Sequence, residues 1–381
     1  MSTRDHILEF LIFLTKSATI RKLSGKPKKI YKYVLGIIFL NLINGDQLKQ
    51  GQNQNIRQVC NILENPIEAT RKYDLEQVKK QAQDFFASRH IKSPYDDATI
   101  DKVFLFFRKK LEDAKKGKTL FLASELEEII NLVPYYEEQD VPIKPHYWLD
   151  FSIMEGLIPT QPEFITYTDM INLWNLSMEQ KNMIDQYHNK ASRGGFGEQF
   201  DKTFELRSKM MTLLRNCVVS AITFAESYLY FLFYDFKQLR LFESNPKVKA
   251  LYDKEGREHI QDTEIIKNLI FEVFPKFKTD NQINKLYKEY RKINNTRNGI
   301  IHTSVSKAKG VQQPKLQPVL NLSLPLVQEY LSTITDFIFT IDEGLPLEHQ
   351  ILFWRDRFEY PDFTMGETIS FKNLEVSSSE K

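Results

Sequence analysis

The stretch that decides the fold is residues 217–236, with the sequence CVVSAITFAESYLYFLFYDF. It is long enough to cross a bilayer, but Glu226 stands at its centre and Asp235 near its end. Because an unpaired carboxylate at mid-bilayer is costly, a buried helix of a helical bundle is the better interpretation. The sequence therefore predicts a mainly α protein built around this helix, with no membrane partner.

Composition favours the same fold class. The chain has 381 residues, enough for more than one domain, and 28 Phe and 17 Tyr stand against only 14 Gly. Low glycine disfavours doubly wound folds with glycine-rich loops. The 52 Lys and Arg nearly balance the 50 Asp and Glu, so any attraction for a polyanion must be local.

The compartment and the metal content follow from a few residues. Cys60 and Cys217 lie far apart, which excludes a disulfide scaffold and a four-cysteine zinc module and fits a reducing compartment. His146 has no second ligand at metal-binding spacing. The N-terminal residues show no secretory signal. We therefore expect a cytoplasmic protein with no metal and no cofactor.

Three regions are expected along the chain. Residues 1–190 form a mostly helical N-terminal domain of no recognisable family, with an irregular segment or short strands in the Pro- and aromatic-rich stretch 133–163. The small residues of 189–198, NKASRGGFGE, mark the main boundary. Residues 200–345 form a helical bundle, and residues 346–381 form a C-terminal extension with a frayed tail.

Four helices are predicted in the bundle region. They cover 200–236, Asp262 to about Pro275, a segment capped by Asp280, and Pro325 to about Ile341. The fourth keeps one apolar face at helical spacing, formed by Val327, Tyr330, Leu331, Ile334, Phe337, Ile338 and Ile341. This pattern is typical of an antiparallel bundle.

The third helix contains an arginine in its core-facing row. Its apolar stripe is Ile283, Leu286, Tyr287, Tyr290 and Ile293. The same spacing leads next to Arg297 and then to Ile300 and Ile301. A buried guanidinium is costly unless it meets a carboxylate, a phosphate ligand or a subunit boundary that keeps it wet. We expect Glu226 to be its partner, since each charge then explains the other.

Polar and basic residues surround this arginine. Asn298 and His302 are four residues apart, so a continuous helix places them on one flank beside Arg297. The candidate RNA-binding residues around them are Lys285, Lys288, Arg291, Lys292, Lys307 and Lys309. Such a patch should attract a polyanion.

Residues 297–302, RNGIIH, resemble the RNxxxH motif of HEPN domains, which are helical bundles found in many toxins, CRISPR effectors and other RNA-cleaving defence proteins. The resemblance includes the apolar first helix with its internal Glu226 and covers about residues 200–345. One departure is Gly299 inside the motif helix, which costs about 1 kcal/mol relative to alanine. If the helix ends before Gly299, Asn298 and His302 no longer align.

The resemblance implies a metal-independent endoribonuclease of a toxin or antiphage-defence kind. An imidazole can exchange protons at neutral pH and a guanidinium can hold nonbridging phosphate oxygens. RNA cleavage through 2′-hydroxyl attack would leave 2′,3′-cyclic phosphate ends. The expected catalytic residues are Arg297, Asn298, His302 and Glu226, in a composite site between two copies of a homodimer. A phage-derived or protein trigger is expected, with residues 1–190 as a sensor, inhibitor or RNA-positioning domain.

Two alternatives stay open. The bundle can be a noncatalytic HEPN-type module that binds RNA or a nucleotide or forms a dimer. Alternatively, Arg297 and Glu226 form only a structural ion pair in an interaction scaffold, and His302 is a capping or surface residue.

Overall fold

The protein is mainly helical. The computed structural model describes residues 22–43, 65–72, 74, 76–77, 97–114, 121–128, 144–152, 156–191, 196–301, 321–359, 363 and 370–371. These residues divide into two compact units, 1–161 and 162–381, which are described in turn.

The first unit combines helices with a small antiparallel sheet. Its elements are α3 (Gly25–Ile43), α5 (Pro66–Lys72), α7 (Asp97–Ala114), β1 (Phe121–Leu122), α8 (Ala123–Glu127), β2 (Trp148–Ser152) and β3 (Gly156–Thr160). The strand order is β1-β2-β3, and Leu149 of β2 pairs with Phe121 on one side and Pro159 on the other. The short strands expected within 133–163 are therefore present as β2 and β3, whereas residues 129–143 lie outside the described part of the chain.

The second unit holds the long helices. Its elements are α10 (Pro162–Ala191), α11 (Phe196–Gln238), α12 (Pro246–Lys254), α13 (Asp262–Ile265), the π-helical turn η2 (Ile266–Ile270), α14 (Phe271–Val273), α15 (Pro275–Thr279), α16 (Asn281–Ile301), α18 (Leu324–Gly344), the 3₁₀ turns η3 (Leu347–His349) and η4 (Phe353–Arg357), and the short strands β4 (Phe358–Glu359) and β5 (Ser370–Phe371). Strands β4 and β5 pair antiparallel.

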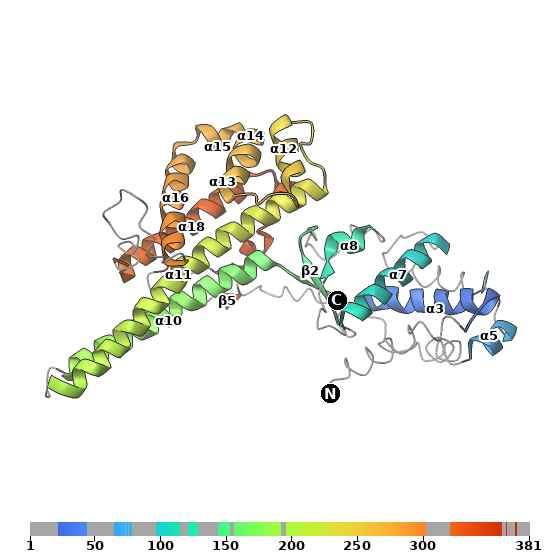
Figure 1. The fold of residues 1–381 in the computed structure, drawn as a ribbon, viewed down its shortest axis with the longest axis horizontal. Coiled ribbons are helices and arrows are strands. Elements are labelled where there is room, and N and C mark those ends of the chain that lie inside the picture. Colours follow the sequence, from blue (N-terminus) through green and yellow to red (C-terminus); the bar gives the residue numbers. More distant parts are fainter. Residues whose placement is uncertain are drawn as a thin grey trace, which may run out of the picture. The chain divides into compact units, whose positions relative to one another are not determined.

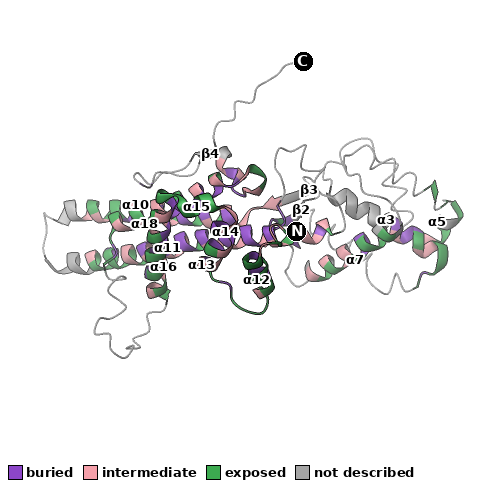
Figure 2. Ribbon diagram, turned by 90° about the horizontal axis from the view of Figure 1, so that it is seen from above, coloured by how far each residue is buried: buried purple, intermediate pink, exposed green. Residues whose placement is uncertain are grey.

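Helix α11 lies at the centre of this unit and contacts α10, α16 and α18 (Figure 1). Its apolar residues from Cys217 to Phe236 are mostly buried, as expected for a core helix, although by length and composition α11 also qualifies as a candidate membrane span. Phe337 of α18 stacks on two tyrosines of α16, with ring centroids 6.2 Å from Tyr287 and 5.2 Å from Tyr290. Buried residues line the faces that these helices turn toward one another (Figure 2).

The division between the units differs from the expected boundary. Along the chain, the division falls between Gln161 and Pro162 rather than within 189–198. Helices α10 and α11, on either side of this glycine-rich stretch, lie side by side in the same unit (Figure 1). The small residues therefore separate two packed helices instead of two domains, a role equally typical of glycine.

The four predicted helices correspond to α11, the α13–η2–α14 segment, α16 and α18. Asp280 caps α16 as expected, because its carboxylate accepts the backbone N–H groups of Gln282 at 2.7 Å and Ile283 at 3.0 Å. The expected cap by Asp262 is wrong. Asp262 is the first residue of α13, and its carboxylate instead accepts hydrogen bonds from α16.

Asp342, at the end of α18, holds the beginning of the C-terminal extension against the helices of the second unit. Its nearly buried carboxylate accepts the hydroxyl of Tyr228 at 3.1 Å and the backbone N–H groups of Ile351 at 3.0 Å and Leu352 at 3.4 Å. Trp354 packs on Tyr167, with ring centroids 5.3 Å apart. The frayed tail expected at the end of the chain lies outside the described residues, which stop at 371.

Candidate functional site

The expected ion pair between Arg297 and Glu226 is present. Arg297 Nη2 donates to Glu226 Oε1 and so joins α16 to α11. The side chains are 16% and 32% exposed, so the pair lies at the edge of the core rather than fully inside it. Burial lowers the pKa of Arg297 from its ordinary value. Arg297 Nε is buried without a hydrogen-bond partner among the described residues.

Helix α16 is continuous through Gly299 as far as Ile301, the last residue before the undescribed stretch 302–320. The glycine therefore does not break the motif helix before residue 301, and the helical spacing from Arg297 to Ile301 is regular. Asn298 is exposed beside Arg297. His302 follows directly but lies outside the described residues.

The basic residues predicted to bind RNA on α16 are exposed: Lys285, Lys288, Arg291 and Lys292. One of them is engaged, since Lys292 Nζ lies 2.7 Å from the Glu289 carboxylate. Lys307 and Lys309 lie outside the described part of the chain. Among the described residues, the positive face of α16 therefore consists chiefly of Lys285, Lys288 and Arg291.

A second polar cluster adjoins the ion pair and was missed by the sequence analysis. Asp262 Oδ2 accepts hydrogen bonds from the Tyr290 hydroxyl and from Asn294 Nδ2, the latter at 2.9 Å. Burial and the charge of Asp262 raise the pKa of Tyr290 well above its ordinary value. The signal in the sequence was the spacing of Tyr290, Asn294 and Arg297, which places three polar groups on one helix face.

Among the residues that the structure describes, no group of three or more His, Cys, Asp or Glu side chains is placed to hold a metal ion.

Comparisons of the chain with protein-family models, with curated proteins and with solved structures find no match.

Proposed function

We propose that the protein is a metal-independent endoribonuclease that uses Arg297, Asn298 and His302. The observation that carries this proposal is the position of Arg297. Its guanidinium contacts Glu226 near the end of α16, beside the exposed Asn298, and the exposed face of the same helix carries a row of basic residues. A guanidinium fixed in this way can hold the nonbridging oxygens of a phosphate that the basic row attracts.

The chemistry assigns one role to each group. His302 exchanges a proton with the attacking 2′-hydroxyl or the leaving 5′-oxygen, because an imidazole titrates near neutral pH. Arg297 stabilises the charge that develops on the phosphorane, and Asn298 orients the phosphate or the imidazole through its amide. The products are 2′,3′-cyclic phosphate and 5′-hydroxyl ends.

The site is completed by a second copy of the chain. One α16 supplies one histidine, and separate acid and base roles need two, so a homodimer brings together Arg297, Asn298 and His302 from both subunits. We place this activity in the cytoplasm, as a toxin or antiphage effector that answers to a phage-derived or protein trigger. This assignment extends the sequence resemblance to HEPN domains.

The test uses purified protein and a labelled single-stranded RNA, with and without EDTA. The proposal expects cleavage that survives EDTA and yields 2′,3′-cyclic phosphate ends, with none from a His302→Ala variant. Wild-type and variant proteins that bind RNA equally and leave it intact, in the presence of the trigger, would favour the noncatalytic binding module.

A further inference from the structure

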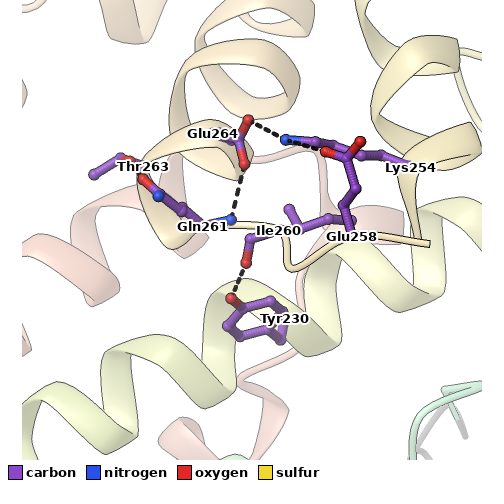
Figure 3. A network of polar contacts seen from close by, with 7 residues as sticks. All are labelled: Tyr230, Lys254, Glu258, Ile260, Gln261, Thr263 and Glu264. Atoms are coloured by element: carbon purple, nitrogen blue, oxygen red, sulfur yellow. Dashed lines mark hydrogen bonds and ion pairs between the residues drawn. The ribbon is translucent and has the colours of Figure 1, made fainter. Parts of the chain in front are cut away.

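The segment Ile260–Asp262 is hydrogen-bonded to both helices of the candidate site. On one side, the Tyr230 hydroxyl of α11 donates to the backbone carbonyl of Ile260 (Figure 3). On the other, the Asp262 carboxylate accepts hydrogen bonds from Tyr290 and Asn294 of α16. This segment therefore bridges the two helices that the ion pair between Arg297 and Glu226 also joins.

Both attachment points lie about one helical turn from the ion pair. Tyr230 is four residues after Glu226 on α11, and Asn294 is three residues before Arg297 on α16. Residues at these spacings share a helix face. A displacement of the segment would therefore change the separation of α11 and α16 close to the point where the guanidinium meets the carboxylate.

The segment is itself held in place by α12 and α13. The Glu264 carboxylate accepts the backbone N–H of Gln261 at 3.0 Å and the ammonium of Lys254 at 2.7 Å (Figure 3). Lys254 also lies 3.5 Å from the Glu258 carboxylate. The hydrogen bond from Gln261, which is the largest cause, and the one from Lys254 lower the pKa of Glu264. The bridge thus has its own support, independent of α11 and α16.

Helix α16 carries two buried polar atoms close to this bridge. Asn294 Oδ1 is buried without a hydrogen-bond partner in the described part of the chain, so the bond from its Nδ2 to Asp262 orients the amide. Arg297 Nε is likewise buried and unpartnered there. The orientation of the guanidinium therefore depends on its contact with Glu226 and on where the two helices stand.

We propose that Tyr230 and Asp262 are positioning residues that fix Arg297 for its contact with the RNA phosphate. They act through the spacing of α11 and α16 and touch no substrate themselves. This inference rests on the proposed ribonuclease function, because the phosphate contact is what the positioning serves. The geometry that it invokes can be measured without any RNA.

The first experiment observes Arg297 directly. The Nε–Hε signal of Arg297 is recorded in ¹H–¹⁵N spectra of wild type, Tyr230→Phe, Asp262→Ala and Asp262→Asn. Tyr252→Phe is the matched control, since its hydroxyl also donates to a backbone carbonyl, that of Leu241 at 2.8 Å, but does not bridge α11 and α16. We expect Tyr230→Phe and Asp262→Ala to shift the signal and speed its hydrogen exchange. Asp262→Asn should stay close to wild type, because its amide oxygen still accepts hydrogen bonds.

The second experiment measures kcat and KM for RNA cleavage by the same variants. We expect Tyr230→Phe to lower kcat about 10- to 100-fold while KM changes little, because misplacement of a catalytic group costs rate more than binding. Should Asp262→Ala fail to fold, Tyr230→Phe still gives the result. An Arg297 signal in Tyr230→Phe that matches Tyr252→Phe would overturn the positioning role. Absence of cleavage by wild type would instead reject the ribonuclease proposal. The Arg297 Nε–Hε spectra would then still test whether the Ile260–Asp262 segment positions the guanidinium.

Discussion

Arg297 and Glu226 are 71 residues apart in the sequence, yet their side chains form an ion pair between α16 and α11. The carboxylate stands in the apolar stretch 217–236 of α11, and the guanidinium occupies a core-facing position of its own helix. Each charge is placed where it would be costly alone, so the pair ties the two helices together at one point.

A double-mutant cycle should detect this coupling. Glu226→Leu leaves a half-buried guanidinium unpaired, so we expect the free energy of unfolding to fall by about 2 kcal/mol, between the values for exposed and buried pairs. Adding Arg297→Met should recover about 1 kcal/mol of that loss. Urea unfolding of wild type, both single variants and the double variant gives the four free energies of unfolding that the cycle compares. Additive effects would contradict a coupled pair.

Asn298 should matter for activity and not for stability. It is exposed on α16, so Asn298→Ala should change the free energy of unfolding by less than about 0.5 kcal/mol. Its proposed role in orienting the phosphate or imidazole predicts a loss of cleavage of about 10-fold or more. Asn295→Ala, an equally exposed asparagine one turn earlier, is the control and should cleave RNA at the wild-type rate. Equal rates for the two variants would remove Asn298 from the site.

The basic face of α16 should account for part of the salt dependence of RNA binding. Each of Lys288→Gln and Arg291→Gln should reduce the slope of log K against log salt concentration by about 0.7, the value for one single-strand phosphate contact. Lys249→Gln removes an exposed lysine from α12 and serves as the control. Fluorescence anisotropy between low and moderate salt gives the slopes. Slopes that do not distinguish α16 from α12 would argue against a localised RNA face.

The Asp342 carboxylate should make the stability of the protein depend on pH. Burial raises the pKa of Asp342 to about 6, although hydrogen bonds from Tyr228, Ile351 and Leu352 and the charge of Arg355 oppose the rise. The carboxylate of Glu163 also faces Tyr228 from α10. Between about pH 4 and pH 6 the folded state binds more protons than the unfolded state, so this contribution falls as pH rises.

The Asp342→Asn variant isolates this effect. The difference between wild type and variant in the free energy of unfolding should change by about 1 kcal/mol per pH unit within that window. Wild type should lose stability relative to the variant as pH rises and level off above about pH 6. Chemical unfolding at several pH values measures this difference in the free energy of unfolding. A difference that stays constant between about pH 4 and pH 6 would show that Asp342 does not titrate in that range.

Local signals predicted much of the fold. The Asp280 cap, the proline near the start of α18 and the apolar stripe of α16 each depend on a few neighbouring residues, and each appears in the structure. The ion pair was predictable because two costly charges stood in otherwise apolar rows. These are cases in which the sequence nearby determines the structure.

Other features depend on distant packing and were not predicted. Asp262 stands at the start of a helical segment and so resembled a cap. The groups that donate hydrogen bonds to its carboxylate, Tyr290 and Asn294, lie about 30 residues further along the chain. The glycine-rich stretch 189–198 resembled a domain boundary, whereas α10 packs along α11. Glycine marks an interruption of a helix, and tertiary contacts decide whether the next helix folds back or starts a new domain.

The most direct test of the account is a map of RNA ends in cells. Wild type, His302→Ala and Asn295→Ala are expressed in a bacterial host with and without phage challenge, and total RNA is sequenced for ends that carry 2′,3′-cyclic phosphate. The account predicts new ends with wild type and Asn295→Ala and none with His302→Ala. Identical RNA ends in all strains, with every protein folded and bound to RNA, would contradict a ribonuclease centred on His302.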